Sequence, residues 1–157
     1  MSPSPDTSTD TSADDVMEAL VRSAFQVMGV MTRISAEHDL SLTQLRVLGI
    51  LRDRRPRVTE LATFLGLDKS TMSGLIDRAE RRGLLKRGKN PHDKRVVDVY
   101  LTPAGHELEQ RLTDEFRRDL APVVDRLPHH QRVEFTRLFE PLLSPPLVIK
   151  PRVTPQR

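Results

Sequence analysis

Within residues 58–102, the spacing of apolar residues changes from a helical period to a strand period. Up to Arg82, apolar residues recur every three or four positions, as on one face of an α-helix. From Leu84 to Leu101 the period falls to two, around a turn marked by Asn90-Pro91. Because neither period fits the other element, this stretch predicts helices followed by a hairpin. The expected strands are residues 84–87 and 94–101.

The first half of this stretch predicts two short helices. One covers TELATFLG, residues 59–66, and ends at Gly66. The other runs from Lys69 to Arg82, with Asp68 as its N-cap and Gly83 as its C-cap. Its inner face carries Met72, Leu75, Ile76 and Ala79. Two short helices joined by a three- to four-residue turn that contains Gly are typical of a helix-turn-helix.

Helices are also predicted on both sides of this stretch. Capping boxes begin the two N-terminal ones, and Thr102-Pro103 begins the first C-terminal one. The expected ranges are about 14–38, 41–54, 103–127 and 133–142, with breaks at Pro56 and Pro128. The fold class is therefore mainly α with a small β-wing. We expect the architecture of a winged helix-turn-helix DNA-binding domain flanked by N- and C-terminal dimerisation helices.

The outer helices carry apolar stripes that no other part of the chain is expected to cover. A second copy is the simplest cover, so we expect a homodimer. The expected interface residues are Val16, Leu20, Val27, Leu120, Phe135, Leu138, Phe139 and Leu142. The expected divisions are a disordered acidic and polar tail (1–13), an N-terminal dimerisation helix (14–40), the winged helix-turn-helix (41–102), C-terminal dimerisation helices (103–143) and an extended Pro-rich arm (144–157).

Positive charge is concentrated in the centre of the chain. Residues 41–102 carry 14 Lys and Arg against 7 Asp and Glu, although the whole chain has a net charge of only +3. Such asymmetry indicates a surface for nucleic acid, or a solvated basic face without a partner. A winged helix that docks proteins, or one that coats DNA without sequence preference, is the alternative.

Composition excludes several other classes of function. The absence of Cys excludes disulfides, Cys zinc sites, iron–sulfur clusters and thiol redox sensing. No apolar run approaches the ~20 residues that span a bilayer, and the polar N-terminus is no secretory signal, so a cytoplasmic protein is expected. The five His residues are scattered, and neither a phosphate-binding loop nor a catalytic triad spacing is present. We therefore expect neither an enzyme nor a metal or other cofactor.

The candidate DNA contacts lie on the second helix of the motif and on the wing. Residues at the N-terminal end of a recognition helix face base edges in the major groove, and a basic wing suits the adjacent minor groove. On the helix the candidates are Lys69, Ser70, Thr71, Ser73, Gly74, Arg78 and Arg81. On the wing they are Lys86, Arg87, Lys89, Asp93, Lys94 and Arg95, with Asp93 either orienting Arg95 or forming a surface ion pair with it.

Three runs of sequence resemble the MarR family of bacterial regulators. They are LTQLRVLGIL, VTELATFLGLDKSTMSGLIDRAERRGLLKR and HDKRVVDVYLTPAG, and the last contains the family's wing signature, Asp93-x-Arg95 followed by Leu101-Thr102-x-x-Gly105. The resemblance covers about residues 14–143. It implies a homodimeric winged-helix protein that binds double-stranded DNA, usually as a repressor. Gly74 departs from the larger, often basic residue that many members carry there.

The resemblance also implies release of DNA by a small lipophilic or phenolic effector bound between the dimer and DNA-binding regions. Met28 and Met31 could line an adaptable pocket for it, with Arg33 and His38 as polar ends. The alternative is that these methionines only pack in the core. Zinc-sensing members have an acidic residue and His where this chain has Leu45-Arg46.

Overall fold

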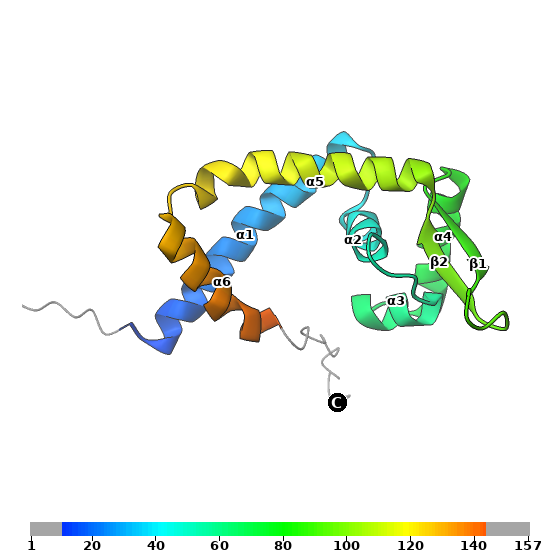
Figure 1. The fold of residues 1–157 in the computed structure, drawn as a ribbon, viewed down its shortest axis with the longest axis horizontal. Coiled ribbons are helices and arrows are strands. Elements are labelled where there is room, and N and C mark those ends of the chain that lie inside the picture. Colours follow the sequence, from blue (N-terminus) through cyan, green and yellow to red (C-terminus); the bar gives the residue numbers. More distant parts are fainter. Residues whose placement is uncertain (1–10, 144–157) are drawn as a thin grey trace, which may run out of the picture.

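The computed structural model describes residues 11–143. In order, these residues form α1 (Ala13–Glu37), α2 (Leu42–Leu51), α3 (Val58–Leu65), α4 (Lys69–Arg81), β1 (Leu85–Lys89), β2 (Val97–Leu101), α5 (Pro103–Val124) and α6 (His129–Leu143). α5 runs from the hairpin across to the outer helices, so that α2, α3, α4 and the hairpin lie at one end and α1 and α6 at the other (Figure 1). Residues 1–10 of the predicted tail and all of the predicted arm lie outside the described residues.

The predicted helix starts and stops are confirmed at most helix ends. Ser12 and Ser41 each accept a hydrogen bond from the backbone three residues later, and Asp15 and Gln44 complete the two capping boxes. Asp68 caps α4 and Thr102 caps α5. Gly66 and Gly83, the expected stops of α3 and α4, have φ values of 67° and 71°, in the left-handed region that glycine enters without strain.

Three predicted helix boundaries are wrong. α2 ends at Leu51 rather than Arg54, because the chain turns and the Pro56 carbonyl accepts a 2.9 Å hydrogen bond from the Val99 backbone of β2. α5 ends at Val124 rather than near residue 127, because the backbone N–H groups of Arg126 and Leu127 donate to carbonyls only three residues back in a closing turn. α6 begins earlier than its apolar stripe suggests, at His129, directly after Pro128.

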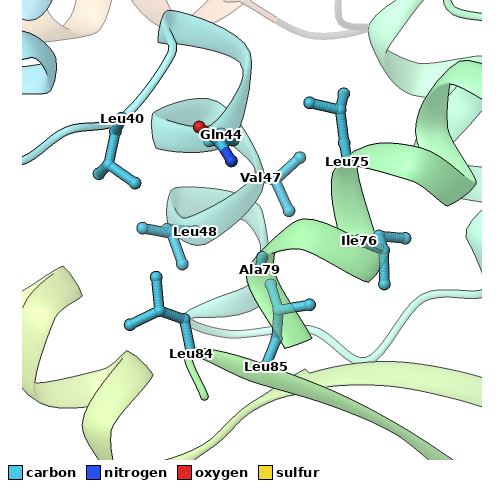
Figure 2. A pocket seen from close by; sticks show the side chains of 9 residues that line it. All are labelled: Leu40, Gln44, Val47, Leu48, Leu75, Ile76, Ala79, Leu84 and Leu85. Atoms are coloured by element: carbon cyan, nitrogen blue, oxygen red, sulfur yellow. The ribbon is translucent and has the colours of Figure 1, made fainter. Parts of the chain in front are cut away.

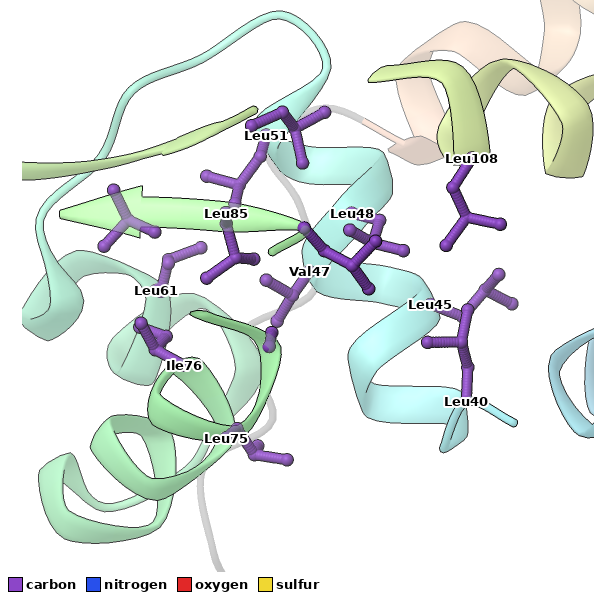
Figure 3. Close-up of a cluster of buried hydrophobic side chains, with 14 of the residues drawn as sticks. Leu40, Leu45, Val47, Leu48, Leu51, Leu61, Leu75, Ile76, Leu85 and Leu108 are labelled. Atoms are coloured by element: carbon purple, nitrogen blue, oxygen red, sulfur yellow. The ribbon is translucent and has the colours of Figure 1, made fainter. Parts of the chain in front are cut away.

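The hydrophobic core lies within the winged helix-turn-helix. Side chains from α2, α3, α4 and β1, among them Leu48, Leu61, Ile76 and Leu85, converge in one cluster (Figure 3). The predicted inner face of α4 is confirmed, since Met72, Leu75, Ile76 and Ala79 are all buried. Leu108 and Leu112 of α5 belong to the same cluster. α5 is therefore packed directly onto the winged helix-turn-helix.

The wing is an antiparallel hairpin in which Leu85 pairs with Leu101 and Lys89 with Val97. Its turn is longer than the predicted residues 88–93, and the returning strand begins at Val97 rather than Lys94. The Asn90 side chain shapes this turn, because its oxygen accepts the backbone N–H groups of His92 and Asp93. Its nitrogen donates to Asp98, only 2% exposed, at 2.6 Å. The period-two pattern did not indicate this buried carboxylate.

Packing explains why the wing signature ends in Gly105. Thr102 accepts a hydrogen bond from the Gly105 backbone and donates one to the Gly83 carbonyl at 2.5 Å. A Cβ added to Gly105 would lie 1.9 Å from the Leu84 carbonyl oxygen. The first turn of α5 therefore rests on the chain between α4 and β1, and only a residue without a side chain fits there.

The outer helices expose apolar side chains. Within the described residues, α6 has no buried residue, and its Phe135 and Leu138 are 51% and 58% exposed. Phe135 stacks on Phe139 with ring centroids 4.4 Å apart. Val16 and Val27 of α1 are also exposed, whereas Leu20, Leu120 and Phe139 are partly buried. None of the described helices combines the length and the apolarity needed to cross a membrane.

Candidate nucleic-acid interface

The N-terminal end of α4 presents short polar side chains. Lys69, Ser70 and Thr71 are exposed, and Ser73 and Gly74 are partly exposed. A Cβ on Gly74 would meet only the end of the Arg78 side chain, at 3.7 Å, so packing within the protein does not require glycine there. Because Gly74 has no side chain, the outer surface of α4 is indented at this position.

Asp68 organises the hydroxyl groups at this end of α4. Its carboxylate accepts hydrogen bonds from Ser70 Oγ at 2.5 Å, Thr71 Oγ1 at 2.6 Å and the Thr71 backbone at 2.8 Å. The Ser70 and Thr71 hydroxyls, followed by the Thr71 backbone N–H, hold the pKa of Asp68 well below its usual range. Both hydroxyls therefore have defined directions before any partner binds.

The wing carries its cations around an exposed tip. Lys86, Lys89, Lys94 and Arg95 are exposed, and the Arg95 side chain is 95% exposed. Asp93 accepts a 3.0 Å hydrogen bond from the Arg95 backbone, while its carboxylate lies 3.5 Å from Arg95 Nε. Within the Asp-x-Arg part of the signature, Asp93 thus holds the backbone of the wing tip, and the Arg95 guanidinium lies in solvent.

The structure places Arg87 differently from the other wing cations. Its guanidinium contacts Asp77 at 2.7 Å and pairs with Glu80, both on α4, and its backbone N–H donates to Glu80 at 2.7 Å. A weaker contact, at 3.4 Å, reaches Ser73. The sequence predicts Arg87 as a DNA contact, whereas its charge is already neutralised by α4. Arg87 therefore holds the wing against α4.

A second arginine beside the wing was not among the sequence candidates. Arg55, from the loop between α2 and α3, lies over the Tyr100 ring with 4.2 Å to its centroid. A Cβ on Gly88 would come within 2.9 Å of the same ring, so Gly88 makes room for Tyr100. Only the fold brings Arg55 and Tyr100 together, which is why the pattern of residues did not indicate this pair.

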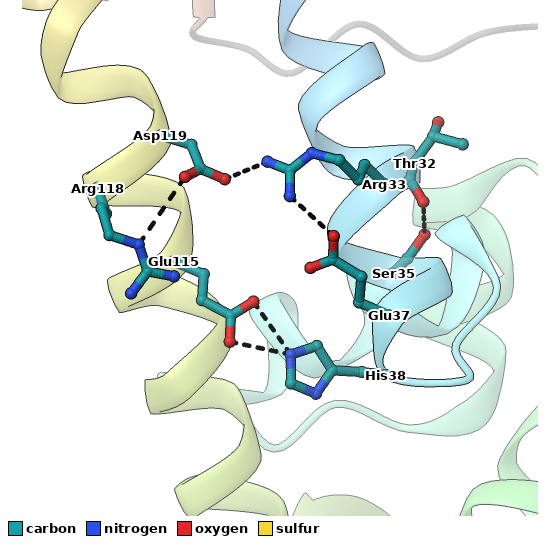
Figure 4. Close-up of polar contacts among 8 residues, drawn as sticks. All are labelled: Thr32, Arg33, Ser35, Glu37, His38, Glu115, Arg118 and Asp119. Atoms are coloured by element: carbon teal, nitrogen blue, oxygen red, sulfur yellow. Dashed lines mark hydrogen bonds and ion pairs between the residues drawn. The ribbon is translucent and has the colours of Figure 1, made fainter.

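The polar candidates for an effector site are engaged between α1 and α5 (Figure 4). Arg33 pairs with Glu37 at 2.9 Å and with Asp119 of α5. His38 Nε2 lies 3.0 Å from both oxygens of Glu115. Met31 packs against the core, while Met28 is exposed. Arg33 and His38 therefore belong to the junction with α5, whereas Met31 belongs to the core and Met28 to the surface.

An open hollow of about 550 Å³ lies elsewhere on α5. Its lining includes Phe116, Leu120 and Val124, together with Arg52 and Arg117. Arg52 lies 3.5 Å from the buried Glu109 and also pairs with Asp53. Within residues 11–143, no group of three His, Cys, Asp or Glu side chains is arranged to hold a metal ion.

Comparisons with known proteins agree with this arrangement. The model of the MarR family matches residues 38–96. The HTH-type transcriptional repressor YetL of Bacillus subtilis is 30% identical over 119 residues, which are 73% of this chain and 71% of YetL. The HTH-type transcriptional regulator YkoM of the same species is 37% identical over 76 residues, 48% of this chain, and the match spans only about half (49%) of YkoM.

Solved structures show the same fold. A MarR family protein from Bacillus stearothermophilus has a TM-score of 0.74 and 26% identity, covering 82% of this chain and 91% of that one. CouR from Rhodococcus jostii RHA1, bound to p-coumaroyl-CoA, has a TM-score of 0.70 and 22% identity. The match covers 87% of this chain and 96% of CouR. With the fold, the basic wing and a relative matched over most of its length, the chain belongs to the MarR family of winged helix-turn-helix transcription regulators.

Proposed function

We propose that this regulator is a homodimeric repressor that binds a pseudo-palindromic operator in double-stranded DNA. The observation that carries the proposal is that short polar side chains at the start of α4 and the cations of the wing tip are both exposed to solvent. Two such helices in one dimer would enter successive major grooves about one helical turn apart. Because the target is chromosomal DNA, we place the protein in the cytoplasm.

Each group of contacts has its own part in this proposal. Ser73 lies where a side chain meets base edges or phosphates, and the Ser70 and Thr71 hydroxyls, which donate to Asp68, are left to accept from donors on base edges. The positive charge along the same helix comes from Lys69, Arg78 and Arg81. Lys86, Lys89, Lys94 and Arg95 would reach phosphates or the minor groove. Arg87 is assigned to holding the wing, since its guanidinium is occupied by Asp77 and Glu80.

The dimer is supported by the apolar surface that the outer helices leave in solvent. Val16, Val27, Phe135, Leu138 and Leu142 are all exposed in the single chain. Monomeric soluble proteins rarely expose large apolar patches, so these side chains favour a partner surface that covers them. Burying them against the same helices of a second copy would place the two winged helices on either side of a two-fold axis.

An effector site is proposed at the hollow on α5 rather than among the α1 candidates. Arg33 and His38 lie in the junction with α5, whereas the hollow is open and combines apolar side chains with two cations. These cations are Arg52, which pairs with Asp53 and Glu109, and Arg117, which pairs with Asp114. That chemistry suits a lipophilic or phenolic compound with an acidic group, and the related CouR structure contains p-coumaroyl-CoA. We expect p-coumarate or a similar aryl carboxylate to weaken DNA binding, and Arg52→Gln to reduce that response.

Fluorescence anisotropy on the DNA upstream of the protein's own gene tests the DNA-binding proposal. The titration is run at several salt concentrations, with a random duplex as competitor. Tight binding that survives the competitor and weakens steeply with salt is the expected result. Equal affinity for both duplexes would instead indicate a protein that coats DNA, and no binding at low salt would indicate a protein-docking module.

A further inference from the structure

The turn between α1 and α2 is a strained junction. Asp39 has a φ of 52°, the one positive value on a non-glycine residue in the described part of the chain. The backbone N–H of Leu40 donates to the Ser35 carbonyl at 2.8 Å, and that of Asp39 to Ala36 at 3.2 Å. This is a Schellman-type end, which usually needs glycine at the position of Asp39. A contact from outside the turn would therefore add to its stability.

Arg82, at the end of α4, supplies that contact. Its Nη1 donates to the Asp39 carbonyl at 2.7 Å, and its Nη2 donates to the His38 carbonyl at 3.2 Å. α1 has no basic residue in its last turn, so a cation from another helix meets the negative end of its dipole. Because the guanidinium is a planar fork, two bonds from one side chain fix an angle as well as a distance.

The same turn is also attached to α5. The His38 ring bonds to Glu115, and one turn earlier Arg33 pairs with Asp119 (Figure 4). His38 therefore joins α5 through its ring and α4 through its carbonyl. A continuous set of directional contacts runs from the long helix α5, through this turn, to the end of the recognition helix.

The packing between α2 and α4 is apolar. Leu40, Leu48, Leu75 and Leu84 line a cavity of only about 10 Å³ between the two helices (Figure 2). Such contacts resist separation of the helices, and the hydrophobic effect behind them is not directional. The fork of Arg82 adds two directional bonds to this packing.

We propose that Arg82 is a positioning residue that sets the angle of α4 relative to α1 and α5, and thereby the half-site spacing that the dimer prefers. The inference rests on the proposed function, because it requires a dimer whose two recognition helices bind one operator. Arg82 itself acts on the protein backbone. Removing it should loosen the spacing requirement without removing a phosphate contact.

The test uses the full-length protein and duplexes selected from a random library by the wild type. One duplex carries the selected spacing, and others have one base pair inserted or deleted between the half-sites. Arg82→Gln removes the fork, and Arg82→Lys keeps the charge but cannot bond both carbonyls in the same geometry. Arg111→Gln is the control for loss of one charge, because Arg111 is exposed on α5 and bonds to no other described residue.

We expect the wild type and Arg111→Gln to prefer the selected spacing by roughly tenfold or more. Both Arg82 variants should bind that duplex more weakly and discriminate between spacings by only about threefold, with an unchanged salt slope. Circular dichroism checks that the variants are folded. Because Arg82→Lys keeps the positive charge, a defect that is seen only in Arg82→Gln would be electrostatic.

Two results would overturn the inference while leaving the proposed function intact. In one, Arg82→Gln keeps the wild-type spacing profile. In the other, it loses affinity equally at every spacing, its salt slope falls by about one and Arg82→Lys restores binding, which is the pattern of a phosphate contact. A wild type that selects no operator would instead contradict the proposed function, and this inference with it.

Discussion

Asp68 is an acidic side chain at the start of a helix that is proposed to approach DNA. Its carboxylate caps α4 and orients Ser70 and Thr71, so its benefit to the helix comes with a negative charge near the phosphates. A cap that depends on ionisation also makes the stability of α4 depend on pH.

Acid should destabilise this protein in part through Asp68. Its pKa is lowered in the folded state, so its contribution is fully present above the pKa of the unfolded chain, near pH 4. That contribution is lost as the pH falls toward the folded value. We expect Asp68→Asn to lower the midpoint of thermal unfolding at pH 7 and to show a smaller further decrease toward pH 3 than the wild type. Glu140→Gln, at an exposed carboxylate, should keep the wild-type profile.

Arg87 and Arg95 should differ in how their loss depends on salt. Arg95→Ala should weaken operator binding by roughly 1–3 kcal/mol and lower the salt slope by about one, because the exposed guanidinium reaches DNA. Arg87→Gln should lower the free energy of unfolding by about 1 kcal/mol and weaken binding at an unchanged slope, because it holds the wing to α4. Anisotropy at four salt concentrations distinguishes them, and equal slopes for the two variants would contradict these assignments.

At the scale of elements, the junction of α4, β1 and α5 determines where the wing stands. Thr102 bonds to the Gly83 carbonyl and to the Gly105 backbone, so one side chain connects the end of α4 to the start of α5. The two strands between α4 and α5 therefore project from the core in a fixed direction.

Gly105 should be the least replaceable glycine of this junction. Gly105→Ala places a Cβ against the Leu84 carbonyl, and we expect a loss of about 3 kcal/mol or more in the free energy of unfolding. Gly49→Ala is the matched control, since nothing lies within 4 Å of a Cβ there, and helix propensity should stabilise it by about 0.5–1 kcal/mol. Urea denaturation measures both, and a harmless Gly105→Ala would show that α5 does not rest on this chain segment as described.

At the scale of the whole molecule, the described chain has two ends of different character. The winged end contains the hydrophobic core, and the outer end exposes apolar side chains on α1 and α6. α5 extends from the winged end to the outer helices, so it connects the two ends of the described chain (Figure 1).

The dimer proposal predicts that a charge on α6 separates the subunits without unfolding them. Phe135→Glu should convert the protein to a monomer in sedimentation equilibrium, because the ring is half-exposed in one chain and would be buried between two. Phe64→Glu, at an exposed ring of α3, should remain dimeric. A dimeric Phe135→Glu protein would place the interface elsewhere.

The sequence by itself determined the order of elements, most of their ends and the inner face of α4. These follow from signals within three to five residues, such as Ser41 with Gln44, Asp68 with Thr71, and glycine at positive φ. The sequence also identified the exposed cations of the wing, because charged residues opposite a buried apolar stripe are expected to lie in solvent. The family resemblance came from the same local runs.

Only the tertiary structure decided what the remaining charged residues contact. Arg87 bonds to α4, Arg82 reaches the end of α1, and Arg33 pairs with a residue 86 positions away. No local pattern indicates such partners, because hydrogen-bond distances of about 3 Å depend on how distant helices pack rather than on their spacing in the chain. The same packing decided that Asp98 is buried and that Gly105 must lack a side chain.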